Sequence, residues 1–200
     1  MDTFTTIQGE GFHSGKTAVF IRFSGCNLWN GIEKFRKRAK CNFCDTDFVG
    51  VDGQNGGEYK LEDLIKKTLE IWGKNKSYHE KFIVLTGGEP LLQVDTQLIK
   101  ELKKKNFYIA LETNGTIKTK LKFDWVVVSP KENASWNLKN GDELKVVYPQ
   151  NKINLKKALD LKFKYFFLQP SNLLSHQILL YQIKFFFYSM FKKIVNCLGT

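Results

Sequence analysis

Residues 17–47 read TAVFIRFSGCNLWNGIEKFRKRAKCNFCDTD, and this stretch decides the fold. It opens with a β-branched and aromatic run at Thr17–Phe23 that ends at Ser24-Gly25, which is the pattern of a buried strand. Three cysteines follow, at positions 26, 41 and 44. Loops that follow buried strands are where α/β proteins gather their ligands, so the cysteines predict a site at the end of this strand.

The cysteine spacing is C-x14-C-x2-C. A structural zinc ion normally takes four protein ligands, whereas an iron–sulfur cluster held by three cysteines leaves one iron free to bind something else. Spacing alone leaves three possibilities open: such a cluster, a zinc site completed by Cys197 or a histidine, and three unrelated buried thiols. The close grouping is typical of a ligand cluster in a reducing compartment rather than of a disulfide framework.

Further β-rich runs are bounded by turn residues, and helical patterns lie between some of them. Strands are expected at Thr17–Phe23, Lys81–Leu85, Phe107–Leu111, Phe123–Val128, Glu143–Val147 and Phe163–Leu168. Apolar residues share one face over Leu61–Trp72 and again over Leu98–Leu102, with a helix start near Asp95. Alternating strands and helices predict an α/β fold with a mostly parallel sheet, either open or barrel-like.

Length and composition fit one globular domain, because 200 residues with 42% hydrophobic and 26% charged content can bury a core. The net charge of +11 favours anionic partners. The N-terminus has no basic segment followed by an apolar one, so no secretory signal is visible and a cytoplasmic location is expected. His13, His79 and His176 show no metal-ligand spacing and are expected to be structural or surface residues.

Residues 33–40 hold five basic residues and one acid. A solvated helical excursion is the simpler interpretation of this run, and a nucleic-acid patch is the alternative.

Several short motifs then follow one another in a fixed order along the chain. They are Ile7-Gln8-Gly9-Glu10-Gly11, Arg22, CDTDF at 44–48, Gly87-Gly88-Glu89-Pro90, Glu112-Thr113-Asn114-Gly115, Ser129-Pro130-Lys131 and Gln169-Pro170. With these motifs the chain resembles, over about residues 4–170, radical S-adenosylmethionine (SAM) enzymes, and among them the 7-carboxy-7-deazaguanine synthase family of queuosine biosynthesis. Most radical SAM enzymes carry C-x3-C-x2-C, and the longer spacer is similar to a variant within this family.

This resemblance implies a fold, a reaction and a set of cofactors. The fold is an incomplete (β/α) barrel of radical SAM type over residues 1–170. The reaction is that of a carbon–nitrogen lyase, which converts 6-carboxy-5,6,7,8-tetrahydropterin to 7-carboxy-7-deazaguanine and ammonia. The implied cofactors are a [4Fe–4S] cluster, SAM and Mg²⁺. In such enzymes an electron from the cluster cleaves SAM to a 5′-deoxyadenosyl radical, and SAM is regenerated at each turnover.

The resemblance also assigns roles to individual residues. Cys26, Cys41 and Cys44 would ligate the cluster and Thr46 the magnesium ion. SAM would contact Phe43, Cys44, Asp45, Gly88, Ser129, Pro130 and Lys131, and the substrate would contact Ile7, Gln8, Gly9, Arg22 and Thr86. Without the resemblance, Gly87-Gly88 and Asn114-Gly115 are ordinary turns, Thr46 is a turn cap and Arg22 is a surface charge.

The expected partners are the pterin, a second copy of the chain in a homodimer, and an acidic electron donor such as flavodoxin. Neither nucleic acid nor a membrane span is expected. Two rival functions remain: a radical-enzyme activase, which leaves the 7–11 and 44–48 motifs unexplained, and a zinc-stabilised nucleic-acid-binding protein that uses residues 33–40. Metal content separates the zinc protein from either enzyme.

Residues 171–200 form an atypical C-terminal tail in which the resemblance stops. The tail contains no Asp or Glu, and its apolar stretches are too short for a membrane span of about 20 residues. A divergent or out-of-frame end is the favoured interpretation over an interfacial or partner-binding helix. An inactive homologue, whose substrate pocket is incompletely closed, is therefore a further alternative, and the tail is expected to promote aggregation.

Overall fold

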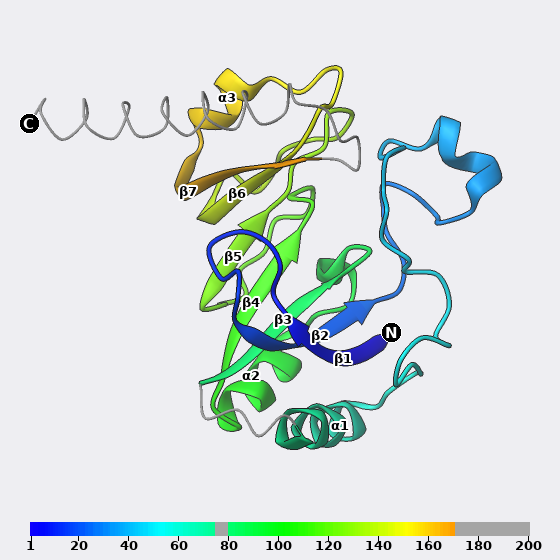
Figure 1. Cartoon of the computed structure of the whole chain (residues 1–200), viewed down its shortest axis with the longest axis vertical. Helices are drawn as coiled ribbons and strands as arrows, with labels where there is room; N and C mark the ends of the chain where they lie inside the picture. Colours follow the sequence, from blue (N-terminus) through cyan, green and yellow to red (C-terminus); the bar gives the residue numbers. More distant parts are fainter. Residues whose placement is uncertain (75–79, 171–200) are drawn as a thin grey trace, which may run out of the picture.

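The computed structural model describes residues 1–74 and 80–170, which form one seven-stranded sheet with helices packed against it (Figure 1). The strands are β1 (Asp2–Ile7), β2 (Thr17–Phe23), β3 (Lys81–Gly87), β4 (Phe107–Thr113), β5 (Trp125–Val128), β6 (Asn140–Tyr148) and β7 (Lys162–Pro170). The helices are α1 (Leu61–Lys74), α2 (Thr96–Lys104) and α3 (Leu155–Leu159), with short 3-10 helices η1 (Glu33–Arg38) and η2 (Pro90–Leu92).

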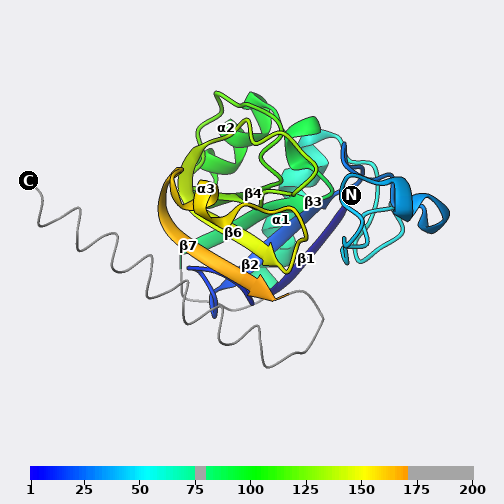
Figure 2. The ribbon, with the colours of Figure 1, turned by 90° about the horizontal axis from the view of Figure 1, so that it is seen from above.

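The strands pair in chain order from β1 to β7. All neighbours from β2 to β7 are parallel, and β1 alone runs antiparallel to β2. β1 and β7 are the two edges, so within the described residues the sheet does not close (Figure 2). The predicted α/β class and incomplete barrel are confirmed. β1 was not predicted, because four of the six residues in DTFTTI are polar and its two apolar residues do not alternate with them.

Helices α1 and α2 lie beside each other and cover one face of the sheet, which we call the outer face (Figure 1). Their buried residues join Val19, Ile21, Ile83 and Leu85 of the strands in the largest core cluster. Asp95 caps α2, since its Oδ1 accepts a hydrogen bond from the backbone N of Leu98 at 2.8 Å. The predicted helix start at this residue is confirmed.

Helices do not fill every connection. In the part of the chain that the structure describes, the segments between β4 and β5 and between β5 and β6 contain no helix, contrary to the expected alternation. Residues 116–124 alternate lysine with apolar side chains rather than forming a helical apolar face, and Pro130 interrupts the second segment. These two connections are therefore loops.

The opposite, inner face of the sheet carries Ala18, Phe82, Val84, Ala110, Trp125 and Val127. The loop between β1 and β2, residues 8–16, crosses this face (Figure 1). His13 lies edge-on to the rings of Phe82, Tyr108 and Trp125, with centroids 4.6–5.7 Å apart. Phe12 stacks on Trp125 at 4.8 Å. Phe12 and His13 thereby cover the amino-terminal half of the inner face.

The basic segment protrudes from the rest of the molecule as η1, with no buried side chain (Figure 1). The predicted solvated helical excursion is confirmed. No helix within residues 1–74 and 80–170 is long and apolar enough to cross a membrane. His79, His176, Cys197 and the tail at 171–200 lie outside the described residues.

Candidate active site

The carboxyl ends of the parallel strands, from the loop after β2 to the end of β7, surround a pocket of about 350 Å³. Strand alternation explains its polar side. On the inner face, β3 runs from Phe82 through Val84 to Thr86, and β4 runs from Tyr108 through Ala110 to Glu112. The apolar row of each strand thus ends in a polar residue at the pocket, while the three cysteines line it from the loops after β2.

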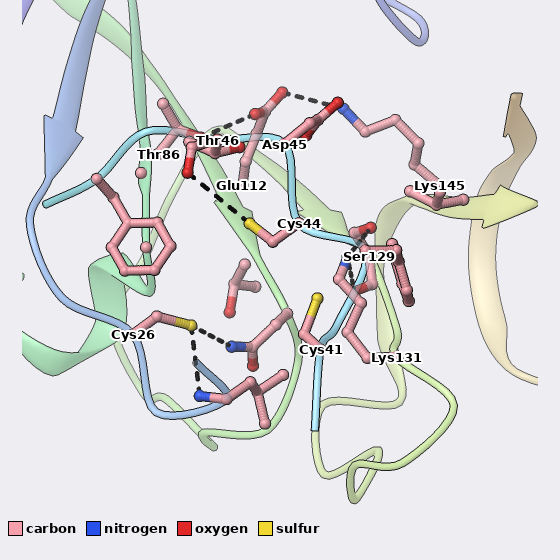
Figure 3. A pocket seen from close by; sticks show the side chains of 18 of the residues that line it. Cys26, Cys41, Cys44, Asp45, Thr46, Thr86, Glu112, Ser129, Lys131 and Lys145 are labelled. Atoms are coloured by element: carbon pink, nitrogen blue, oxygen red, sulfur yellow. Dashed lines mark hydrogen bonds and ion pairs between the residues drawn. The ribbon is translucent and has the colours of Figure 1, made fainter. Parts of the chain in front are cut away.

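The three cysteine side chains point toward one another across this pocket (Figure 3). All three are free thiols. Cys26 sits in the loop directly after β2, and its Sγ accepts from the backbone N of Leu28 at 3.4 Å and faces Asn114 Nδ2 at 3.9 Å. Cys41 and Cys44 lie on the opposite side in one short turn. The structure therefore brings together the three residues that the sequence predicted as cluster ligands.

The electrostatics of the two paired thiols differ. A hydrogen bond between them raises the pKa of Cys41 and lowers that of Cys44 to about 6, so Cys44 takes the thiolate role of the pair. The ammonium of half-buried Lys131 favours the thiolate form of both. Burial is the main cause that lowers the pKa of Lys131 itself, and its Nζ donates to the carbonyl oxygen of Ser129 at 3.0 Å and to Ser129 Oγ at 2.7 Å.

These features fit a polynuclear cluster. Three thiols can ligate an iron–sulfur cluster, and N–H donors beside the Cys26 sulfur and a nearby cation are features that tune the potential of such a cluster. Among the residues that the structure describes, no three or more His, Cys, Asp or Glu side chains form a group that could hold a metal ion. The donor set thus consists of three sulfurs spread around a pocket rather than a compact shell around one ion.

A buried carboxylate joins the loops around the pocket. Glu89 is fully buried and accepts from Thr113 Oγ1 at 2.7 Å and from the backbone N of Asn114 at 2.8 Å. Its own backbone N donates to the carbonyl oxygen of Gly25 at 2.9 Å. A Cβ on Gly88 would collide with that same Gly25 carbonyl, so only glycine permits this approach. The loops after β2, β3 and β4 are therefore locked to one another.

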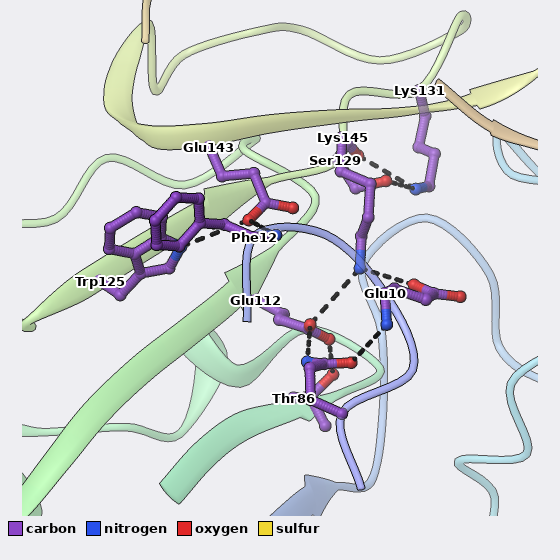
Figure 4. Close-up of polar contacts among 10 residues, drawn as sticks. Glu10, Phe12, Thr86, Glu112, Trp125, Ser129, Lys131, Glu143 and Lys145 are labelled. Atoms are coloured by element: carbon purple, nitrogen blue, oxygen red, sulfur yellow. Dashed lines mark hydrogen bonds and ion pairs between the residues drawn. The ribbon is translucent and has the colours of Figure 1, made fainter. Parts of the chain in front are cut away.

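A charged network forms the floor of the pocket (Figure 4). Lys145 of β6 is nearly buried, with 8% of its side chain exposed, and its Nζ lies 2.7 Å from Glu10 Oε2 and 3.4 Å from Glu112 Oε1. Glu112 also accepts from Gln8 Nε2 and Thr86 Oγ1, each at 3.0 Å. Burial would lower the pKa of Lys145, but Glu112 and Glu10 outweigh it and raise the pKa above its usual value. Lys145 therefore stays charged.

Most residues that the sequence assigned to SAM, magnesium or substrate line the pocket, and some do not. The lining includes Phe43, Cys44, Asp45, Thr46, Thr86, Gly88, Ser129 and Lys131. It does not include Ile7, Gln8, Gly9, Arg22 or Pro130. Gln8 still reaches the floor through Glu112, whereas Ile7 is 63% exposed. The Arg22 guanidinium lies over the Phe4 ring at 5.0 Å.

Sequence reasoning gave no role to Glu10, Glu89, Glu112 or Lys145. A signal for Lys145 was present, since Glu143 and Lys145 stand two residues apart in the otherwise apolar run Glu143–Val147 and so share one face of the strand. Opposite charges on one face of a central strand indicate a buried polar network. Glu89 gave no such signal, because its role depends on loops that only the fold brings together.

Comparisons with known proteins agree with this geometry. Residues 38–129 match the family model described as the radical SAM superfamily. The chain is 47% identical over 170 residues to the 7-carboxy-7-deazaguanine synthase of Burkholderia multivorans, covering 84% of this chain and 80% of that protein. The synthase of Caulobacter vibrioides is 48% identical with the same coverage. The crystal structure of QueE from Escherichia coli superposes with a TM-score of 0.65 at 26% identity, covering 92% of this chain and 86% of that one.

Proposed function

The chain belongs to the 7-carboxy-7-deazaguanine synthase family of radical SAM proteins, and from this premise we propose how its pocket carries out the family reaction. The reaction is a lyase step of queuosine biosynthesis, in which 6-carboxy-5,6,7,8-tetrahydropterin loses one ammonia and contracts to 7-carboxy-7-deazaguanine. Substrate and products balance without net oxidation. The family thus separates this chain from the activase and zinc-protein alternatives.

Cys26, Cys41 and Cys44 hold a [4Fe–4S] cluster in this proposal, with SAM beside it. When bound, this pair of cofactors supplies one-electron cleavage of SAM and hence radical chemistry. Phe43, Asp45, Gly88 and the segment 129–131 surround SAM. The protein's own part is positioning: the interlocked loops fix the pocket walls, and Lys131 balances the negative charge of the thiolates.

Thr46 is the proposed protein ligand of Mg²⁺. It follows Cys44 by two residues and lines the pocket, and a hydroxyl suits an ion that keeps most of its water. Thr86 and Gln8 are proposed to meet the substrate through the Glu112 carboxylate that both contact. Arg22 and the backbone at Ile7 and Gly9 are proposed as further substrate contacts at the pocket rim.

One observation carries the proposal: three free thiols from two loops converge in a single pocket with Glu112 and Lys145, in a chain 47% identical to a 7-carboxy-7-deazaguanine synthase. The test is anaerobic turnover of the reconstituted full chain with the carboxytetrahydropterin, SAM, Mg²⁺ and a reductant. We expect the deazaguanine product and ammonia in equal amounts, without net consumption of SAM. Brown protein that cleaves SAM but forms no product, both in the native chain and in a chain with a family-like ending, would contradict the substrate assignment.

A homodimer and an acidic electron donor such as flavodoxin complete the proposal. The support for the donor is the net charge of +11, because opposite charge accelerates encounter between proteins. Donor-dependent turnover that falls steeply with added salt would support it. Sedimentation of the loaded protein tests the dimer.

The tail provides the one alternative within the family. We propose that residues 1–170 form the radical SAM unit and that the 171–200 ending limits turnover. A chain truncated after Pro170 and a chain with a family-like ending are the matched comparisons. Equal activity and dispersity of the native chain and the chain with the family-like ending would show that the tail is a functional variant.

A further inference from the structure

The spacer between Cys26 and Cys41 contains η1, and the side chain of Arg36 in this helix returns to the loop that carries Cys41 and Cys44. η1 has no buried residue and projects into solvent (Figure 1). Arg36 is the exception to this exposure, with only 28% of its side chain accessible. Its guanidinium points back to the segment that carries the other two cysteines.

Arg36 contacts both halves of the cysteine motif. Its Nη1 donates to the carbonyl oxygen of Asn42 at 3.2 Å and to that of Cys44 at 2.9 Å. Its guanidinium carbon lies 4.0 Å from the ring centroid of Trp29, three residues after Cys26. Its Nε pairs with Glu33 at 2.8 Å, which orients the planar group.

We propose that Arg36 is a positioning residue that shapes the Cys41–Cys44 turn before the cluster binds. This inference rests on the proposed function, because it assumes that the turn holds a cluster. Trp29 provides the surface on which the guanidinium stacks, so the two ligand segments are held at a fixed separation by one side chain.

Peptide geometry indicates what the contact achieves. In a planar trans peptide the C=O and N–H point in opposite directions. Because the carbonyls of Asn42 and Cys44 face the guanidinium, the N–H groups of Phe43 and Asp45 point away from it. Phe43 and Asp45 line the pocket, whereas Arg36 does not. We call the contacts of Arg36 with Trp29 and with the two carbonyls the Arg36 clamp. The clamp therefore turns two N–H dipoles to the side where the thiolates lie, and such dipoles tune the potential of an iron–sulfur cluster.

A simple surface ion pair between Glu33 and Arg36 is the competing explanation. Exposed pairs of this spacing contribute little to stability. They also require no contact with backbone carbonyls nine and eleven residues from Glu33, and they require no aromatic ring. A lysine would preserve the charge but cannot stack as a plane and donate to several acceptors in a fixed fork.

The experiment compares Arg36→Gln and Arg36→Lys with Arg38→Gln. Arg38 lies in the same 3-10 helix and is exposed, so its replacement removes the same charge without removing the clamp. The first readout uses the metal-free protein: amide hydrogen exchange of residues 42–46. The second uses the reconstituted protein: the rate at which a chelator removes iron, with the EPR signal of the reduced cluster.

We expect both Arg36 variants to exchange and to lose iron about tenfold faster than the native chain, with an altered EPR signal. Arg38→Gln should match the native chain in every readout. If Arg36→Lys behaves like the native chain, the planar donor geometry of the guanidinium is not needed. If Arg36→Gln behaves like Arg38→Gln, Arg36 does not position the Cys41–Cys44 turn, and the proposal is wrong. If the native chain binds no [4Fe–4S] cluster, the proposed function fails, while the exchange measurement still decides the clamp.

Discussion

At the carboxyl end of the inner face, thiols, carboxylates and ammonium groups surround an open pocket, whereas at the amino end aromatic rings fill the space. The loop at residues 8–16 serves both ends. Gln8 and Glu10 reach the network of Glu112 and Lys145, while Phe12 and His13 pack among the rings. The loop is thus held by apolar contacts at one end so that it can present polar groups at the other.

Strand β6 repeats this division. Lys145 faces the pocket floor, and Glu143, two residues earlier, faces the aromatic end. Glu143 Oε2 accepts from the backbone N of Phe12 at 3.1 Å and from Trp125 Nε1 at 3.4 Å (Figure 4). Burial is the main cause that raises the pKa of Glu143. If this comparison is correct, substitutions at the pocket end should change cofactors and turnover, and substitutions at the aromatic end should change stability.

The largest effect is expected at the cysteines. Replacing any one of Cys26, Cys41 and Cys44 by alanine should remove the cluster and all SAM cleavage, because three thiolates are the minimum set here. Cys197→Ala is the matched control and should keep both. Iron and sulfide analysis after anaerobic reconstitution measures the result. Full cluster occupancy in a Cys41 variant would refute the three-ligand assignment.

The next effect is expected at Lys145. Lys145→Met leaves the Glu112 and Glu10 carboxylates without their shared cation, so turnover should fall about 10- to 100-fold with cluster content unchanged. Glu112 is only 20% exposed, so leaving its carboxylate without the cation should also lower the free energy of unfolding. The double variant Lys145→Met/Glu112→Gln restores charge balance and should recover stability but not turnover. Recovery of both would show that the network has no part in the reaction.

A smaller effect is expected at Thr46. Thr46→Val removes one oxygen at nearly constant volume, so the magnesium needed for half-maximal turnover should rise while the iron content stays constant. Thr116→Val, which removes a hydroxyl from a loop residue outside the pocket lining, is a control. An unchanged magnesium dependence would return Thr46 to a turn-capping role.

At the aromatic end, Gly11 tests the loop anchor. Its φ is +69°, and a Cβ there would collide with the Glu143 carboxylate. Gly15, in the same loop, has φ +90° but open space around it. Gly11→Ala should therefore lower the free energy of unfolding by more than Gly15→Ala, which bears only backbone strain of about 1–3 kcal/mol. Equal losses of unfolding free energy in urea for the two variants would mean that the Glu143 side chain moves away from the new Cβ without cost.

The sequence predicted the parallel strands well, because buried strands such as Thr17–Phe23 and Lys81–Leu85 each contain four consecutive apolar residues. It also predicted that the three cysteines gather at a site after the strand Thr17–Phe23 and that a helix starts near Asp95, since cysteine spacing and helix caps are visible as local patterns. It did not predict β1, whose strand character comes from pairing with β2. Glu89 and Lys145 were missed for a related reason: their partners lie 24 and 135 residues away, at Thr113 and Glu10.

The smallest effect is expected at His13, the centre of the aromatic end. The residue is 6% exposed, and neither ring nitrogen has a hydrogen-bond partner among the described residues. Burial first, and then the charge of Lys16, lower the pKa of His13 below its ordinary 6.5, while Asp142 acts weakly in the opposite direction. The folded protein therefore holds the neutral imidazole, and its stability should be fully present above pH 6.5.

As the pH falls below 6.5, the unfolded chain binds a proton at His13 before the folded chain does, so the free energy of unfolding should decrease. His13→Phe keeps a ring in the same position and removes both unpartnered nitrogens. The free energy of unfolding of the variant should be about 1 kcal/mol higher at pH 7.5. It should also decrease less steeply below pH 6.5, because the variant has no imidazole to protonate at this position. Urea unfolding from pH 7.5 to 5 measures both, with turnover at pH 7.5 as the control on the pocket end.

An unchanged decrease of the unfolding free energy with falling pH would show that His13 is protonated within the fold. A loss of turnover would show that the two ends are coupled through the loop at residues 8–16.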